Sequence, residues 1–244
     1  FINVNDSFID ELNKYKELDK ISGAISSDSK INSNKIKEIV FAKGKNIKEQ
    51  INYALSQGLK NKNIVEFHFK INRNFFFEIA KLRAFRILWN EKKGYNPFIN
   101  VSISKKDKKS ELKNIFKSTT EITSAILGGA NAIFSQAHNF DYKASDDFSD
   151  RISRNQFNIL LEESYLNKVK DPSKGSYYIE YLTTEFLKDF DIKIKNEEKS
   201  SNSIFVSAEQ IDIKEIYSKH DIEKVEHLNF IAGSPPFLRG PYST

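Results

Sequence analysis

Residues 64–89 read IVEFHFKINRNFFFEIAKLRAFRILW, and this stretch predicts the fold of the first part of the chain. It opens with β-branched and aromatic residues around one glutamate and one histidine, at 64–69, as is typical of a buried strand. After a short polar break, residues 75–89 place apolar side chains at helical spacing along a wide stripe. A buried strand followed by an amphipathic helix predicts a βαβ unit and hence a parallel sheet.

The same alternation of strand and helix continues on both sides of this stretch. Further buried strands are expected at three apolar runs, 39–42, 98–103 and 131–134. Helical patterns separate the strands, at 47–57, 111–127 and 147–165. Four clear strands are too few for a closed barrel, which needs eight strands and about 250 residues. We therefore predict an α/β fold in which residues 1–187 form part of a (β/α)8 TIM-type barrel.

The composition changes after residue 187. Residues 193–203 are polar and lack periodicity, so the segment 188–205 is interpreted as a linker. Beyond it, one short helix is expected at 218–227. The prolines from Pro235 to Pro241 exclude a further helix. The prediction for residues 206–244 is an extended C-terminal arm.

Composition also limits the class of protein. The net charge of the 244 residues is +5, but lysines and glutamates are interspersed, which favours a solvated mixed-charge surface over a nucleic-acid interface. The chain has no cysteine, which excludes disulfides, thiolate metal sites and cysteine nucleophiles. No run of about 18 apolar residues and no signal-peptide pattern occurs, so we expect a cytoplasmic protein without a membrane span. The sequence starts at Phe1 and has no methionine, so we treat it as a fragment.

Three motifs occur in order along the barrel segment. Residues 75–89 follow F-F-x-E-I-A-K-x-R-A-x-R-x-L-W, residues 151–155 read RISRN, and residues 171–183 follow D-P-x-x-G-S-Y-Y-x-E-x-L-T. Together they resemble the barrel of the methylmalonyl-CoA mutase family over roughly residues 60–185, while residues 1–59 match by pattern only. The resemblance implies the C-terminal half of the barrel. It also implies a part in a cobalamin-dependent isomerase that interconverts methylmalonyl-CoA and succinyl-CoA.

Two positions depart from the catalytic pattern of that family. In catalytic chains the fifth residue after a Gly-Gly pair, here Gly128-Gly129, is a histidine, whereas this chain has Phe134. A phenyl ring cannot donate a proton. Asn72 stands where the family places a substrate-side histidine, so His68, four residues earlier, is interpreted as structural. The resemblance therefore implies the small, non-catalytic subunit, with no catalytic residue and no activity of the isolated chain.

Cofactor binding is not expected of this chain. The family motif D-x-H-x-x-G, whose imidazole lies under the cobalt of cobalamin, does not occur in the sequence. No histidine spacing typical of a metal site occurs either. The resemblance implies that adenosylcobalamin belongs to the parent complex, in which this chain forms a heterodimer with a catalytic mutase subunit. The alternatives are an interaction subunit without substrate binding and a basic nucleic-acid-binding module.

The last residues resemble a different part of the family. The segment from Gln210 onward, which ends in R-G-P-Y-x-T at 239–244, is similar to the start of the catalytic large subunit. The resemblance implies that Arg239, Tyr242 and Thr244 bind the CoA thioester substrate. In the family this segment precedes the barrel, whereas here it follows; joined genes and an assembled fusion both explain that order. The alternative is a proline-rich tail that packs on a partner.

Overall fold

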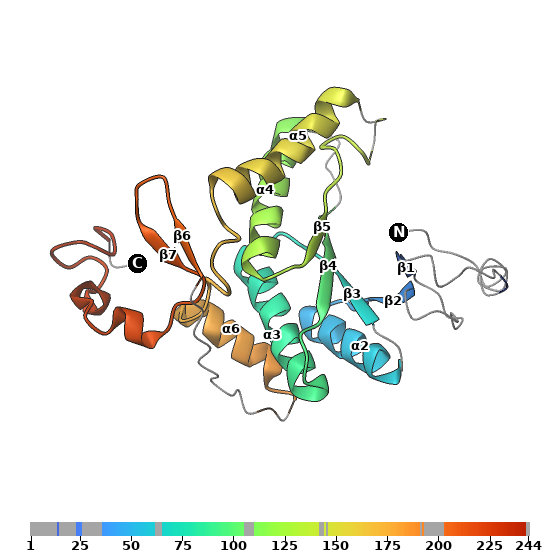
Figure 1. Cartoon of the computed structure of the whole chain (residues 1–244), viewed down its shortest axis with the longest axis horizontal. Helices are drawn as coiled ribbons and strands as arrows, with labels where there is room; N and C mark the ends of the chain where they lie inside the picture. The colour runs from blue at the N-terminus through green and yellow to red at the C-terminus, as the bar shows by residue number, and fades with distance from the viewer. Residues whose placement is uncertain are drawn as a thin grey trace. The chain divides into compact units, whose positions relative to one another are not determined.

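The computed structural model describes residues 14, 23–25, 36–61, 65–104, 110–141, 144, 146–190, 192 and 203–242. The chain divides into two compact units, unit 1 (Phe1–Lys195) and unit 2 (Asn196–Thr244). Unit 1 carries a sheet with helices, and unit 2 carries a hairpin with short turns (Figure 1).

Unit 1 is built on a parallel sheet whose strands lie in chain order. They are β1 (Gly23–Ile25), β2 (Ile36–Phe41), β3 (Val65–Lys70), β4 (Phe98–Ser102) and β5 (Ala132–Phe134). With right-handed crossovers, this order places all connecting helices on one face, whereas a doubly wound sheet reverses its order in the middle. The predicted α/β class is confirmed, and the sheet is consistent with part of a (β/α) barrel.

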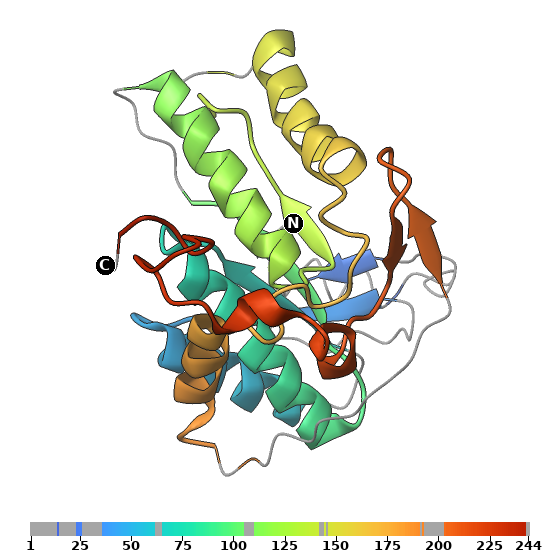
Figure 2. The same cartoon turned by 90° about the vertical axis from the view of Figure 1, so that its left-hand side faces the viewer.

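Helices follow the strands and are bounded by recognisable caps. They are α2 (Ile47–Lys60), α3 (Phe75–Lys93), α4 (Glu111–Leu127), α5 (Asp147–Asn158) and α6 (Tyr177–Leu187). The side chains of Asn46, Ser110 and Asp146 accept hydrogen bonds from backbone N–H groups in the first turns of α2, α4 and α5. Gly94, at φ 77°, ends α3 in the left-handed conformation. Helices α3 and α6 lie side by side (Figures 1 and 2).

The core of unit 1 lies between the sheet and α3. Alternate residues of β3 and β4 are buried there, and the ring of Phe67 contacts those of Phe85 and Trp89, at 4.7 and 4.5 Å between centroids. Helix α3 is buried on most sides, so its charged side chains need partners inside the protein. Lys81 forms an ion pair with Glu78 and donates a hydrogen bond of 2.8 Å to the carbonyl of Lys70.

Several predicted boundaries of unit 1 differ from the structure. The helix expected over 147–165 is α-helical to Asn158 and continues as the π-helix η2 (Ile159–Glu163). The strand expected at 39–42 is β2, which starts three residues earlier, and Ile64 of the strand expected at 64–69 lies outside the described residues. Strand β1 was not predicted, because three residues give too short a pattern to recognise.

Unit 2 differs from the predicted extended arm, which is not confirmed. Strands β6 (Ile204–Val206) and β7 (Asp212–Lys214) pair as an antiparallel hairpin. The prediction of a single helix at 218–227 is wrong. Two 3₁₀ turns, η3 (Lys219–Ile222) and η4 (Glu226–Asn229), occupy this segment. Ser218 and Asp221 form a capping box at the first of these turns, in which the side chain of each accepts a hydrogen bond from the backbone N–H of the other. Most of the expected linker 188–205 lies outside the described residues.

The contact between α2 and the aromatic core yields a first prediction. A Cβ atom added at Gly58 would lie 2.7 Å from the rings of Phe67 and Trp89, both of which are fully buried. Gly58→Ala gains about 1 kcal/mol of helix propensity but overpacks the core at a cost of about 1–3 kcal/mol. We expect a net loss of up to about 2 kcal/mol, measured by urea unfolding.

The matched control is Ser56→Ala, on the exposed face of the same helix. It creates the same residue type without a core contact, so its unfolding free energy should change by less than about 0.5 kcal/mol. A Gly58→Ala variant as stable as the Ser56→Ala variant would show that the helix and the two rings do not pack as closely as described.

Candidate functional site

Polar side chains line the face of the sheet that points away from α3. We call Glu66, His68, Asn100 and Ser102 the inner-face polar row, since this face would point to the axis of a complete barrel. The amide of Asn100 donates a hydrogen bond of 2.9 Å to the carboxylate of Glu66. His68 Nε2 and Ser102 Oγ lie 3.0 Å apart and share a hydrogen bond. The row therefore connects neighbouring strands through paired polar groups.

His68 lies among aromatic rings in this row. Its ring centroid is 4.8 Å from that of Phe41 and 6.0 Å from that of Phe134. Burial lowers the pKa of His68 to about 4, so the imidazole is neutral at pH 7. A neutral imidazole that shares a hydrogen bond with a serine hydroxyl fits the structural role expected for His68.

The two positions that depart from the catalytic pattern lie toward the carboxyl ends of the strands. Phe134 is the last residue of β5, and its side chain is 41% exposed. Asn72 is exposed in the turn between β3 and α3. Ligands of parallel barrels bind at this end of the sheet. Neither a phenyl ring nor an amide can act there as a general acid or base.

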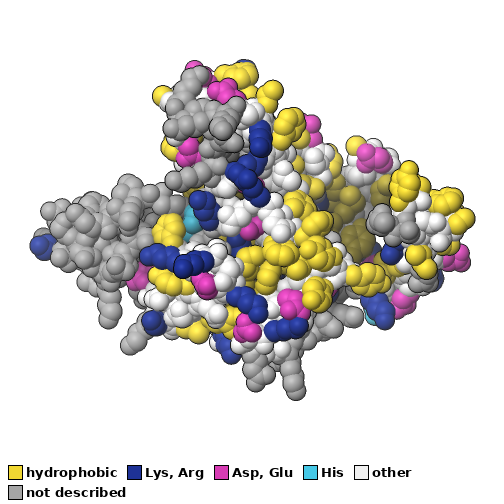
Figure 3. Space-filling view, turned by 180° about the vertical axis from the view of Figure 1, so that it is seen from behind, with side chains coloured by type: hydrophobic (Ala, Val, Ile, Leu, Met, Phe, Trp, Pro, Cys, Tyr) yellow, Lys and Arg dark blue, Asp and Glu magenta, His cyan; other side chains and the backbone are white. Residues whose placement is uncertain are grey.

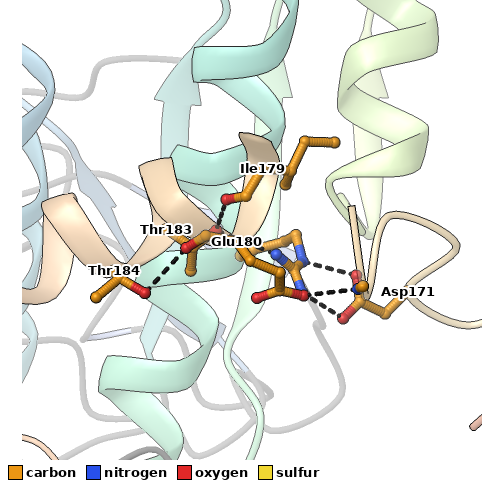
Figure 4. A network of polar contacts seen from close by, with 7 residues as sticks. Asp171, Ile179, Glu180, Thr183 and Thr184 are labelled. Carbon is orange, nitrogen blue, oxygen red and sulfur yellow. Dashed lines mark hydrogen bonds and ion pairs between the residues drawn. The ribbon is translucent and has the colours of Figure 1, made fainter. Parts of the chain in front are cut away.

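A network of polar contacts holds the segment after η2 against α3. The guanidinium of Arg83 forms two hydrogen bonds with the carboxylate of Asp171, of 2.7 and 3.0 Å, and one of 2.9 Å with Glu180. It also donates one of 3.1 Å to the hydroxyl of Thr183, so three side chains converge on one cation (Figure 4). Burial alone would lower the pKa of Arg83, but Asp171 and Glu180 raise it overall.

The Gly-Gly pair borders a groove of about 770 Å³ at the opposite, amino end of β5. Arg86 donates hydrogen bonds there to the carbonyl of Gly129 and to the side chain of Asn131, the latter at 3.2 Å. Burial lowers the pKa of Arg86. The backbone of Gly129 is left-handed, at φ 79°, which explains a glycine at this position. The pair thus shapes the turn into β5, remote from the carboxyl ends of the strands.

The residues expected to bind CoA lie in unit 2. Arg239 is exposed and donates a hydrogen bond of 3.0 Å to the carbonyl of Leu228. Tyr242 is 78% exposed, and Thr244 lies outside the described residues. Arg239 and Tyr242 therefore lie on the surface of one short segment. In the described part of the chain, no three His, Asp or Glu side chains lie close enough to hold a metal ion. No described helix is long and apolar enough to cross a membrane.

The inner-face polar row was missed from the sequence, although a signal for most of it exists. In β3 the polar residues Glu66 and His68 alternate with Val65, Phe67 and Phe69. In β4 the same alternation occurs at Asn100 and Ser102. A period of two in a buried strand marks two different faces, one toward the helices and one toward the axis.

Comparisons with known proteins agree with the motifs. A family model described as methylmalonyl-CoA mutase matches residues 20–200. The methylmalonyl-CoA mutase small subunit of Porphyromonas gingivalis is 40% identical over 131 residues, which cover 49% of this chain and 21% of the relative. The methylmalonyl-CoA mutase of Escherichia coli is 32% identical over 170 residues, which cover 64% and 24%. The chain thus spans about a fifth to a quarter of the curated relatives it matches.

The buried His68 yields a prediction about stability and pH. The unfolded chain binds a proton at this imidazole near pH 6.5, but the folded protein does so only near pH 4. Stability due to neutral His68 is therefore complete above pH 6.5 and is lost as the pH falls toward 4, by about 1–3 kcal/mol. The measurement is the urea unfolding free energy of the wild type and of His68→Gln between pH 7.5 and 4.5. Because the variant lacks this titration, a constant difference between the two proteins over that range would contradict the prediction.

Proposed function

The chain belongs to the methylmalonyl-CoA mutase family, and from this premise we propose that it is part of a non-catalytic subunit that packs against a catalytic mutase subunit. The observation that carries the proposal is Phe134 at the carboxyl end of β5, in a position where a catalytic chain needs a proton donor. The names of two relatives support it: they are methylmalonyl-CoA mutase small subunits, of Porphyromonas gingivalis and Streptomyces virginiae.

The proposed reaction of the whole complex is the adenosylcobalamin-dependent interconversion of methylmalonyl-CoA and succinyl-CoA, in the cytoplasm. The family motif D-x-H-x-x-G, whose imidazole lies under the cobalt, does not occur in the sequence. Among the described histidine side chains, His68 and His138 are buried. We therefore assign cobalamin to the partner and derive no step through it in this chain.

The surface of unit 1 supports a role in subunit contact. Among the described strands, β1 and β5 each pair with a single neighbour, so they form the two edges of the sheet. Aromatic side chains of α3 and α6 are exposed next to one another, with Phe76 and Tyr178 in ring contact at 5.4 Å. Tyr177 and Tyr181, on α6, are 83% and 61% exposed. Hydrophobic side chains also gather on one face of the molecule (Figure 3). Exposed aromatic surface of this kind is enriched at protein interfaces.

The subunit proposal predicts that the isolated chain is inactive and that it associates with a catalytic partner. Purified chain supplied with methylmalonyl-CoA and adenosylcobalamin should form no succinyl-CoA, because it lacks the proton donor and the cobalt ligand. Light scattering should detect a complex with a purified catalytic mutase subunit. A double variant, Tyr177→Ala with Tyr181→Ala, should weaken that complex by about tenfold or more, since exposed aromatic side chains dominate interface energies.

The control is Tyr95→Ala, which removes an aromatic side chain that is 45% exposed, just after the C-terminal end of α3. It should leave the complex unchanged. Turnover by the chain alone would contradict the non-catalytic role. Equal affinity of the double variant and the control would place the interface elsewhere.

We further propose that Arg239, Tyr242 and Thr244 contact the CoA thioester in the complex. The support is chemical: a guanidinium has five N–H donors, and the described hydrogen bond to Leu228 occupies one of them. Charge-assisted bonds from the remaining donors suit a phosphate. The same bond to Leu228 favours a second reading, in which Arg239 fixes the fold of unit 2 and the segment packs on a partner.

Calorimetry with CoA separates these two readings. If Arg239 binds phosphate, Arg239→Ala should weaken CoA binding by about 1.5–3 kcal/mol, as expected for a lost charged hydrogen bond. Lys224→Ala, which removes another exposed cation of unit 2, should leave the affinity unchanged. Absence of CoA binding, or equal binding by the Arg239→Ala variant, would remove these residues from the substrate site.

A further inference from the structure

The groove beside the Gly-Gly pair, at the amino end of β5, has the size of a binding site for a small molecule. Its volume is about 770 Å³, within the range of about 300–1,000 Å³ found for ligand pockets. Its walls come from α3, from the end of α4 with the turn into β5, and from α5, η2 and the segment after them. Every residue that lines the groove belongs to the described part of unit 1.

The walls of the groove are mostly apolar, and many of their side chains are only partly buried. Some of them, such as Ile87 and Leu127, pack against the main core of unit 1. Others, such as Phe157 and Leu166, pack against a second, smaller cluster of buried residues. Leu161 adds an apolar side chain from η2. The groove therefore presents apolar surface whose position is fixed by core packing on both sides.

Arg86 brings a positive charge to this apolar groove, and its hydrogen bonds go to neutral groups. Its guanidinium donates to the carbonyl of Pro97, at 3.3 Å, to the carbonyl of Gly129, and to the side chain of Asn131, at 3.2 Å. These bonds use one N–H of Nη1 and both N–H groups of Nη2. The N–H of Nε has no acceptor among the described residues.

The one carboxylate that lines the groove pairs with a different arginine. Asp171 forms two hydrogen bonds with Arg83, of 2.7 and 3.0 Å. Burial lowers the pKa of Arg86, and the negative charge of Asp171 offsets this effect only in part. The protein therefore compensates the charge of Arg86 incompletely, which favours an anion beside its guanidinium.

The backbone leaves space for such an anion. Gly129 has no side chain, and the three atoms nearest to a Cβ added there would all belong to the guanidinium of Arg86, at 3.5 to 4.0 Å. The nearest of the three is Nε, the nitrogen whose N–H has no described acceptor. An oxygen atom of a ligand in this space would therefore lie next to an unused donor.

We propose that the groove binds a small apolar carboxylate, with the carboxylate beside Arg86 and the hydrocarbon chain between the apolar walls. A guanidinium forms charge-assisted hydrogen bonds with a carboxylate, which are stronger than bonds between neutral groups. Burial of each CH₂ group of the chain adds a favourable hydrophobic contribution. The site goes beyond the proposed subunit role, and it is independent of the CoA contacts proposed for unit 2.

Calorimetric titration of the full chain with octanoate and with octanol tests this site, since the two probes share a chain length and differ in charge. We expect a Kd of about 0.1 mM for octanoate and about tenfold weaker binding of octanol. Arg86→Gln should weaken octanoate binding by about tenfold and leave octanol binding unchanged, because the lost charge acts on the carboxylate. Leu161→Ala should weaken the binding of both probes by about threefold, because it removes part of the apolar wall.

Two control variants should bind octanoate like the wild type. Arg154→Gln removes an exposed guanidinium from α5, and Leu59→Ala removes a leucine side chain that is 42% exposed on α2. If Arg86→Gln loses both probes, Arg86→Lys decides: a preference for octanoate over octanol supports the site, and equal affinities overturn it. Absence of octanoate saturation below about 2 mM, or equal octanoate binding by Arg86→Gln and Arg154→Gln, would also overturn the site.

Discussion

The guanidinium of Arg83 is the contact on which the described arrangement of unit 1 depends. It lies on a helix buried on most sides, where an unpaired cation would cost several kcal/mol. The ion pair with Asp171 meets that need, and it also fixes a residue whose backbone is left-handed, at φ 48°. The bonds to Glu180 and Thr183 then dock α6 against α3. One buried charge thus determines where the chain returns to the barrel segment.

This contact also explains why two of the family motifs occur together. Arg83 belongs to the first motif, while Asp171, Glu180 and Thr183 belong to the third, about 90 to 100 residues later. The sequence shows each motif as a separate pattern. Which residue pairs with which depends on the way α6 packs on α3, and local spacing carries no information about that packing. Arg83 of the first motif and the three residues of the third motif are thus two halves of one network.

Local sequence patterns also show why some elements could be predicted and others could not. The strands β3 and β4 have enough apolar residues to be recognised, because most of their residues are buried. Each strand of the hairpin in unit 2 has only three paired residues. Which residues pair depends on contacts between the two strands, and the sequence of each strand alone does not show them. The α-to-π transition after Asn158 leaves the apolar pattern of α5 intact, so this pattern does not predict the transition. Among site residues, the departure at Phe134 could be found from the sequence, whereas the contacts of His68 with Ser102 and Phe41 needed the fold.

The two faces of the sheet have separate roles, and this separation is what the proposed non-catalytic role requires. The face toward α3 is filled by large side chains such as Phe67, on which stability depends. The opposite face carries polar groups that pair with one another, such as Glu66 with Asn100. Phe134 ends β5 with its side chain 41% exposed, so a change from an acid–base residue to phenylalanine there leaves the core intact. A chain can therefore lose its proton donor, keep its barrel packing, and remain suited to supporting a catalytic partner.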